Sequence, residues 1–600
     1  MCVIIFNSVK NRKSDLMFKL FKNLRIKEWI LMFISIGLIV FQVYLDLKMP
    51  DYMSEITKLV QTDGSKMGDI LTNGGYMLLC AFGSLLSAIV VGYLVANITS
   101  LFSLNTRKKL FSKVENLGIG EIKEFKTSSL ITRTTNDITQ IEMFLGMGLQ
   151  LLIKAPITAM WAVTKILNKS WEWSLATFIA VVVLLIVISI ITLIVVPRFK
   201  IVQKTIDKLN NITRENLLGI RVIRAFNAEN YQKEKFETVN NDLTKLLTFN
   251  QKTFAIFSPF MFFTMHALSL SIYFIGASLI SNSILFDRIN IFSNMVVFSS
   301  YAMQVIMSFL MLAMIFMLMP RANVSAKRIN EVLDKELSIK DGNVDSNSNN
   351  EKGTVEFKNV SFMYDDAEEY VLKDISFKVE KGETVAFIGS TGSGKSTLIN
   401  LIPRFYDVTK GEILVDGINI KDYKEDYLRS KLGYVSQKAV IFSGSVKDNV
   451  AYGDKKISNK KIEEAIKVAQ AEDFVLKMDD KYDSNLAQGG TNISGGQKQR
   501  LSIARAIAKN PEIYIFDDSF SALDYKTDSI LRKELKKYTK DATILIVAQR
   551  IGTVLNADKI VVLDKGRCVG IGTHKELFNN CEVYKQIALS QLSKEELENA

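Results

Sequence analysis

The stretch Gly389-Ser-Thr-Gly-Ser-Gly-Lys-Ser-Thr397 decides the fold of the second half of the chain. It fits the pattern GxxxxGK[ST], in which glycines let backbone N–H groups cradle phosphate oxygens and the lysine reaches the outer phosphates. An apolar run, 384–388, precedes it and another, 397–402, follows it, which predicts the strand and the helix that such a loop requires. We therefore expect a phosphate-binding loop made of Gly389, Ser390, Thr391, Gly392, Ser393, Gly394, Lys395, Ser396 and Thr397.

A second nucleotide-binding element lies further along the chain. The apolar residues 513–516 predict a buried strand, and Asp517 and Asp518 follow it directly. An aspartate at this place is suited to hold Mg²⁺ through water. β-like runs at 354–357, 375–379 and 384–388, followed by helical segments and Gly-rich turns, predict an α/β domain. Together these features indicate a P-loop nucleoside triphosphatase fold.

The first half of the chain has the composition of a membrane protein. Over 600 residues 48% are hydrophobic, and the mean hydropathy is +0.15. Runs long enough to cross about 30 Å of hydrocarbon occur six times before residue 320. We expect an α-helical domain with spans near 29–47, 76–98, 145–166, 173–196, 253–281 and 289–319.

Charge distribution predicts the orientation of these spans. The net charge is +12, and the basic excess lies entirely in the first 340 residues. A nucleic-acid-binding protein would carry its basic excess on its soluble domain, so the charge distribution argues against a nucleic-acid partner. Segments 99–144 and 197–252 are rich in Lys and Arg, whereas the short segments on the other side are not. Both termini are therefore expected in the cytoplasm, and the apolar start at 3–6 is too short for a signal peptide.

Composition also divides the chain into domains. Residues 341–350 form a polar tract that cannot build a core, which indicates a linker. Four dispersed cysteines and two histidines indicate neither a disulfide framework nor a zinc site. The expected parts are a cytoplasmic segment 1–28, a transmembrane domain 29–320 with two long intracellular helical extensions, a linker 321–352 and a nucleotide-binding domain 353–600.

The stretch Asn492-Ile-Ser-Gly-Gly-Gln-Lys-Gln-Arg500 resembles the signature motif of the ATP-binding cassette (ABC) transporters, and the other motifs occur in that family's order. The resemblance implies ATP and Mg²⁺ as ligands, and stretches 130–137 and 215–226 resemble the family's coupling segments. It also implies an adenine-stacking Tyr364, a Q-loop Gln437, Mg²⁺ ligands Ser396, Gln437 and Asp517, a signature of Ser494, Gly495, Gly496 and Gln497, and a D-loop of Ser521, Ala522, Leu523 and Asp524.

Two positions depart from the family pattern. Asp518 stands where a competent site has the glutamate that polarises water, and Gln549 stands where the switch histidine is expected. Losing one methylene retracts the carboxylate by roughly 1 to 1.5 Å, and a misplacement of that size can lower the rate by about 10²-fold. Neutral drift in an active enzyme is one explanation. The other is a degenerate site in one half of a heterodimer, since the signature stays intact.

The resemblance therefore implies a bacterial plasma-membrane exporter subunit, paired with a homologous half-transporter, that extrudes hydrophobic or amphipathic compounds by alternating access. A peptide or lipid exporter of the same build and a nucleotide-gated regulatory protein with little turnover remain alternatives. Lys154 lies inside the third expected span, where it either reaches the interface or a wet cavity, or takes part in substrate binding.

Overall fold

The computed structural model describes residues 19–22, 24–62, 64–167, 169–346, 352–454, 456–593 and 596–597. Most of the expected N-terminal segment 1–28 and the end of the expected linker lie outside these residues. The chain forms two compact units. One comprises Met1–Glu115 and Ser128–Lys335, and the other comprises Asn116–Thr127 and Glu336–Ala600.

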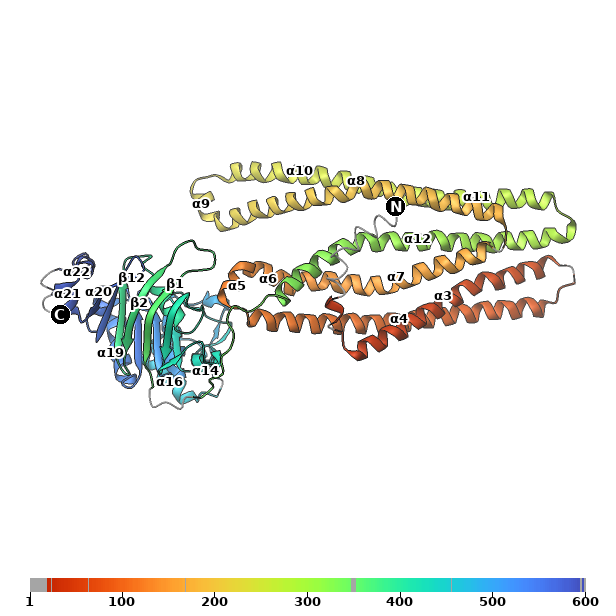
Figure 1. Ribbon diagram of the computed structural model, residues 1–600. Coiled ribbons are helices and arrows are strands. Elements are labelled where there is room, and N and C mark those ends of the chain that lie inside the picture. Colours follow the sequence, from red (N-terminus) through yellow and green to blue (C-terminus); the bar gives the residue numbers. More distant parts are fainter. Residues whose placement is uncertain are drawn as a thin grey trace. The chain divides into compact units, whose positions relative to one another are not determined.

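The regular elements of the first unit are all helices among its described residues (Figure 1). Six of its helical segments are long and apolar enough to cross a membrane, which confirms the expected number of spans. α4 alone has 49 residues, whereas about 20 suffice to cross the hydrocarbon, so it extends well beyond it. The helices are α3 (Ile26–Gln61), α4 (Met67–Glu115), α6 (Thr127–Thr134), α7 (Asn136–Leu167), α8 (Trp171–Leu218), α9 (Ile220–Ala225), α10 (Glu229–Ala255), α11 (Phe257–Ser281) and α12 (Leu285–Leu333).

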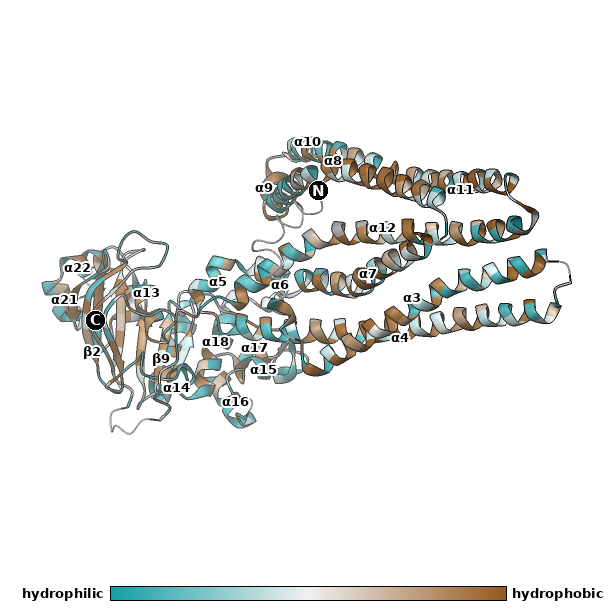
Figure 2. Cartoon of the chain, turned by 45° about the vertical axis from the view of Figure 1, so that its right-hand side comes forward, coloured by the Kyte–Doolittle hydropathy of each residue, from teal (hydrophilic) through white to brown (hydrophobic). Residues whose placement is uncertain are grey.

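Hydropathy along these helices is not uniform (Figure 2). α10 is strongly polar, whereas α11, which continues from it, is strongly apolar. α9 lies within the coupling-like stretch 215–226, at the turn between α8 and α10. The other coupling-like stretch, 130–137, is divided between the end of α6 and the start of α7.

Lys154 of α7 does not stand alone. Its Nζ lies 3.2 Å from Oδ2 of Asp46 on α3, and the Ser84 hydroxyl of α4 donates to Oδ1 of the same carboxylate. A charge inside a membrane span is costly unless it is paired. The pairing therefore gives Lys154 a structural role between α3 and α7, rather than that of a side chain reaching the interface alone.

The expected linker begins later than residue 321. α12 continues to Leu333, because Ala322, Ala326, Ile329 and Val332 recur at helical spacing and are buried. Beyond α12, part of the polar tract is ordered within the second unit. The Gly342 N–H donates to the Tyr423 carbonyl at 3.0 Å, and the Val344 N–H donates to the Asp422 carbonyl at 2.9 Å.

The second unit is an α/β domain, as the sequence predicts, and the structure shows that it contains three sheets. The largest has the strand order β12-β11-β3-β10-β9-β6, with β11, β3, β10, β9 and β6 parallel and β12 antiparallel at one edge. A four-stranded antiparallel sheet has the order β2-β1-β4-β5, and β7 pairs with β8. The strands are β1 (Val355–Phe362), β2 (Leu372–Val379), β3 (Thr384–Gly389), β4 (Lys410–Val415), β5 (Ile418–Asn419), β6 (Leu432–Val435), β7 (Gly444–Ser445), β8 (Asn485–Leu486), β9 (Ile513–Asp517), β10 (Thr543–Val547), β11 (Lys559–Asp564) and β12 (Arg567–Gly572).

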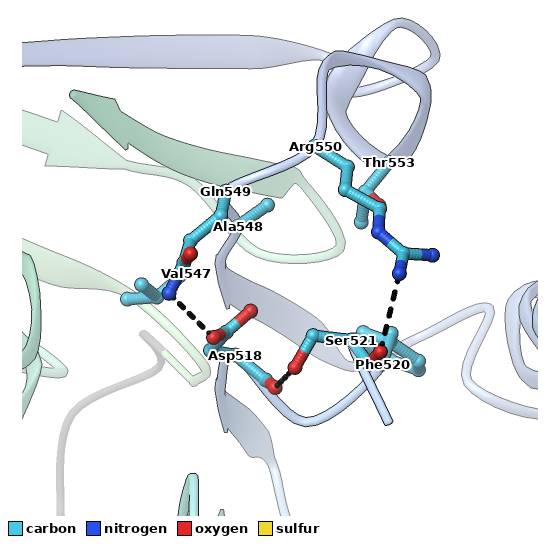
Figure 3. Close-up of a pocket in the computed structure, with 8 residues that line it drawn as sticks. All are labelled: Asp518, Phe520, Ser521, Val547, Ala548, Gln549, Arg550 and Thr553. Carbon is cyan, nitrogen blue, oxygen red and sulfur yellow. Dashed lines mark hydrogen bonds between the residues drawn. The ribbon is translucent and has the colours of Figure 1, made fainter. Parts of the chain in front are cut away.

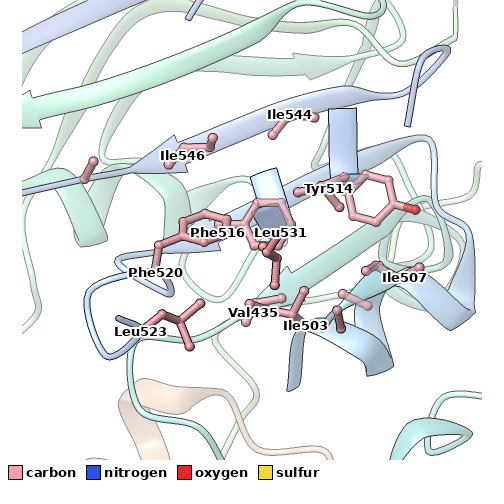
Figure 4. Packing of buried hydrophobic residues seen from close by; sticks show 14 of the residues in the cluster. Val435, Ile503, Ile507, Tyr514, Phe516, Phe520, Leu523, Leu531, Ile544 and Ile546 are labelled. Carbon is pink, nitrogen blue, oxygen red and sulfur yellow. The ribbon is translucent and has the colours of Figure 1, made fainter. Parts of the chain in front are cut away.

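Both faces of the large sheet are buried. Tyr514 and Phe516 of β9 point into one core and Ile513 and Ile515 into the other, because successive side chains of a strand alternate between its faces. Figure 4 shows the first core, where helical residues such as Ile503 and Ile507 cover the strand side chains. Burial on both faces explains why the central strands read as continuous apolar runs.

The helices of this unit surround the sheets. α5 belongs to it, although α5 follows the membrane helix α4 in the chain, so the segment 116–127 packs with the α/β domain rather than with the helical unit. The helices are α5 (Ile119–Phe125), α13 (Lys395–Leu401), α14 (Glu425–Ser430), α15 (Val446–Val450), α16 (Asn459–Val468), α17 (Glu472–Val475), η1 (Lys481–Asp483), η2 (Gln488–Gly490), α18 (Gly495–Lys509), α19 (Tyr525–Tyr538), α20 (Ile551–Val554), α21 (His574–Asn580) and α22 (Glu582–Leu589).

Candidate functional site

Four adjacent parallel strands carry the candidate site at their carboxyl ends. The phosphate-binding loop follows β3, Asp517 ends β9, and Gln549 and Gln437 follow β10 and β6. Ligands of parallel α/β sheets bind at this edge, because the strand ends and the loops after them converge there. The topology therefore brings together residues that are more than 150 positions apart in the sequence.

The phosphate-binding loop has the backbone that its glycines permit. Gly392 and Gly394 have φ values of 83° and 96°, which favour glycine, and a Cβ at Gly394 would lie 2.7 Å from a Leu372 side-chain carbon. The buried Lys395 ammonium turns into the loop, where it donates to the Gly389 and Ser390 carbonyls at 2.8 Å each. Burial lowers the pKa of Lys395, and Asp518 and Asp517 oppose this shift. Because its hydrogen-bond partners are neutral carbonyl oxygens, the buried Lys395 ammonium favours the binding of an anion in the loop.

Ser396 and Asp517 form the oxygen-rich part of the site. The Ser396 hydroxyl donates to Oδ1 of Asp517 at 2.8 Å. The pKa of Asp517 is raised by burial and, to a smaller extent, by the charge of the neighbouring Asp518, whereas the hydrogen bond from Ser396 lowers this pKa. A hydroxyl and a carboxylate are the hard donors that Mg²⁺ accepts, and a cation there would favour the charged carboxylate. Among the described residues no cluster of three or more His, Cys, Asp or Glu could hold a metal by itself.

Asp518 is held by two amides. Nε2 of Gln549 donates to its Oδ2 at 2.7 Å, and Nε2 of Gln437 donates to the same oxygen at 3.2 Å. Figure 3 shows the Gln549 contact in a small pocket that Asp518 and Gln549 help to line. Burial raises the pKa of Asp518, while the contacts with Gln437 and Ser521 lower it. Gln437, expected as a Mg²⁺ ligand, thus contacts Asp518 rather than Asp517.

The loop after Asp518 contains the four expected D-loop residues. The Ser521 hydroxyl donates to the Asp518 carbonyl at 2.9 Å, and the Arg550 guanidinium donates to the Ser521 carbonyl at 3.3 Å (Figure 3). Ala522 is exposed, whereas the Leu523 side chain is buried in the core shown in Figure 4. Asp524 caps α19 by accepting from the Thr527 N–H at 2.9 Å.

The signature residues open helix α18 at the surface. The Ser494 N–H donates to Oε1 of Gln497 at 2.8 Å, and the Gln497 N–H donates to the Ser494 hydroxyl at 3.3 Å, which makes a reciprocal capping box. Ser494 and Gly495 are exposed, and a Cβ at Gly495 would meet no atom within 4 Å. This helix start therefore faces open space, where another molecule can reach it.

Tyr364, the expected adenine-stacking residue, lies beside the phosphate-binding loop. Its hydroxyl lies 3.1 Å from the Thr397 hydroxyl. Two residues that the sequence analysis did not predict also contact Tyr364. The ring of Tyr406 is perpendicular to that of Tyr364, and the ammonium of Lys123 on α5 lies over both rings. No motif spacing relates these three residues, so only the fold could reveal them.

These features define a P-loop ATPase domain of the cassette type joined to a helical membrane domain. Two family profiles match the chain: "ABC transporter" over residues 372–521 and "ABC transporter transmembrane region" over residues 32–309. An uncharacterized ABC transporter ATP-binding protein of Mycobacterium tuberculosis is 36% identical over 549 residues, which cover 90% of this chain and 93% of the relative. The chain belongs to the ABC transporter family, and it is a multi-pass membrane protein whose ATPase domain couples ATP hydrolysis to transport.

Two further comparisons add detail. A Staphylococcus aureus protein, named provisionally as a multidrug export ATP-binding/permease protein, is 46% identical over 257 residues, 43% of this chain and 44% of the relative. The solved structure of a bacterial Atm1-family ABC exporter with ATP bound has a TM-score of 0.78 and 23% identity, and the match covers 92% of this chain and 97% of that chain. This likeness supports the exporter fold for the six-helix domain and the cassette together.

Proposed function

We propose that this chain is one subunit of a heterodimeric ABC exporter in a bacterial plasma membrane. In this proposal its own ATP site binds Mg²⁺ and ATP but hydrolyses slowly, and its signature motif completes the hydrolytic site of a homologous partner. The substrates are hydrophobic or amphipathic compounds. The provisional name of the Staphylococcus aureus relative supports a multidrug type of substrate.

The contact between Gln549 and Asp518 carries the proposal. A general base for ATP hydrolysis must direct a free carboxylate oxygen at the attacking water. Here Oδ2 of Asp518 accepts from two neutral amides, at 2.7 Å and 3.2 Å. These bonds hold the carboxylate and leave its other oxygen for the water, with a reach one methylene shorter than that of a glutamate. Gln549 can donate to a phosphate but cannot carry the positive charge of an imidazolium. Both changes weaken the same chemical step.

The remaining residues support nucleotide binding by this chain. Tyr364 offers a ring for the base, the loop N–H groups and Lys395 bind phosphate oxygens, and Ser396 with Asp517 would hold Mg²⁺. When bound, the cation neutralises charge on the phosphates. Lys395 must exchange its loop carbonyls for phosphate oxygens, which costs little because both are hydrogen-bond acceptors.

A gain-of-function experiment tests the degenerate site directly. The purified full-length chain should show little ATPase activity. The double variant Asp518→Glu with Gln549→His should raise this activity by at least tenfold, because the longer carboxylate then reaches the water and an imidazole can contact the γ-phosphate. Phosphate release by the chain in lipid nanodiscs measures this.

The matched control places Lys395→Ala in the double variant, where activity should fall back to the background rate because phosphate binding is lost. If wild type already turns over ATP at a rate equal to that of the double variant, neutral drift in an active enzyme explains the two residues and the degenerate-site proposal is wrong.

A further inference from the structure

Helix α5 rests on the aromatic residues that form the base end of the nucleotide site. Nζ of Lys123 lies 5.3 Å from the centre of the Tyr364 ring and 5.7 Å from that of Tyr406. The two rings are perpendicular, with an interplanar angle of 88° and centres 5.2 Å apart. A hydrogen bond to Tyr406 raises the pKa of Lys123, so the side chain is cationic. An ammonium at this distance from aromatic rings makes a cation–π contact.

Tyr364 is also tied to the phosphate-binding loop. Its hydroxyl lies 3.1 Å from that of Thr397, the last residue of the loop. The Phe362 ring packs against it edge to face, at 4.8 Å between centres. Tyr364 therefore contacts the phosphate loop at one end and α5 at its ring.

The other end of α5 is anchored to the segment that follows the membrane domain. Oε1 of the buried Glu121 accepts from the Ser338 N–H at 2.8 Å. A Cβ at Gly118 would lie 2.5 Å from Oε2 of Glu121 and 3.4 Å from the Ser338 hydroxyl, so this approach is close. α5 is thus fixed at Glu121, and Lys123 sits two residues further along the same short helix.

We propose that Lys123 is a positioning residue that orients Tyr364 for the nucleotide base, so that α5 responds to the base and not to the phosphates alone. The inference rests on the proposed function, because it takes ATP as the ligand of this site. A base that stacks on Tyr364 fixes the ring that the ammonium contacts, and the bound base and the Lys123 contact therefore stabilise each other. The membrane-connected helix would then distinguish a nucleotide from a bare polyphosphate.

Substitution of Lys123 separates base from phosphate recognition. The full-length chain in nanodiscs is titrated with ATP and with inorganic triphosphate, in EDTA to prevent hydrolysis. Lys123→Met should weaken ATP binding about three- to tenfold, leave triphosphate binding unchanged, and be rescued by Lys123→Arg, which keeps a cation over the rings. Lys126→Met is the matched control, because it removes a charge just after α5 without altering the Tyr364 contact, and it should change neither affinity.

Hydrogen exchange of the α5 amides gives a second readout. ATP should slow exchange of 119–125 in wild type, triphosphate should not, and Lys123→Met should abolish the ATP effect. The inference is wrong if Lys123→Met binds ATP as wild type does, if it loses both ligands equally, or if triphosphate protects α5 as well as ATP. Failure of wild type to bind ATP at all would instead overturn the proposed nucleotide site.

Discussion

At the scale of single residues, the adjacent carboxylates Asp517 and Asp518 are held in surroundings that disfavour their charge. Both are buried, and burial raises the pKa of each above the ordinary aspartate value of 3.8. Such carboxylates destabilise the folded domain when they are ionised, and sites that bind charged ligands commonly retain them. The raised pKa of Asp518 gives this cost a pH dependence that can be measured.

Asp518→Asn should raise the melting temperature of the nucleotide-binding domain at pH 7. The pKa of Asp518 in the folded chain lies above the unfolded value of 3.8. The stability of the folded chain therefore falls as the pH rises from 3.8 through the folded pKa, and the loss of stability is complete above the folded pKa. The advantage of the neutral amide should therefore be full at pH 7 and shrink as the pH falls toward 3.8. Scanning fluorimetry of the nucleotide-free chain at several pH values measures it.

Asp524 supplies the control of opposite sign. The Thr527 backbone N–H lowers the pKa of this exposed capping residue, so its charge stabilises the fold at neutral pH and this stabilisation is lost as the pH falls through the lowered pKa. Asp524→Asn should slightly lower the melting temperature at pH 7. A stabilisation of equal size by both substitutions would show that the Asp518 effect has another cause than its buried charge.

At the scale of elements, the segment after α12 combines a polar composition with a definite docking geometry. Low hydropathy correctly excludes a core of its own. It does not exclude hydrogen bonds to an existing edge, and Val344 forms a parallel bridge with Tyr423 while Lys424 pairs with Asp345 at 2.7 Å. The backbone of this tract, rather than its side-chain hydrophobicity, determines where it lies.

Gly342→Ala should release this tract. A Cβ at Gly342 would lie 2.1 Å from the Asp422 carbonyl oxygen and 2.2 Å from its carbon, which the backbone cannot accommodate without moving. The hydrogen bonds of Gly342 and Val344 to the Asp422–Tyr423 segment should then be lost, and cleavage of the tract in limited proteolysis should become several-fold faster. Gly453→Ala is the control, because a Cβ there meets no atom within 4 Å. Equal cleavage of both variants would show that the tract is not held at Gly342.

At the scale of the whole molecule, the sequence predicted what local chemistry determines. Phosphate binding requires the spacing of residues 389–397, and a membrane requires long apolar helices, so both could be located without a structure. The pairs Asp46–Lys154 and Lys123–Tyr364 could not. Each joins residues more than a hundred positions apart, without a periodic pattern, and only the packing of the elements brings them into contact.

The heterodimer proposal assigns unequal roles to two motifs of this one chain. Gly495→Asp should leave the chain folded and able to bind ATP, because a Cβ at Gly495 meets no atom within 4 Å. The same substitution should abolish ATP hydrolysis by the complex co-purified with its partner, since the exposed start of α18 serves the partner's site. Asp518→Ala in the same complex should retain most of the activity. Gly552→Asp, at another open glycine, controls for the added charge. Equal losses with Gly495→Asp and Asp518→Ala would show two equivalent sites, and the proposal of unequal roles would be wrong.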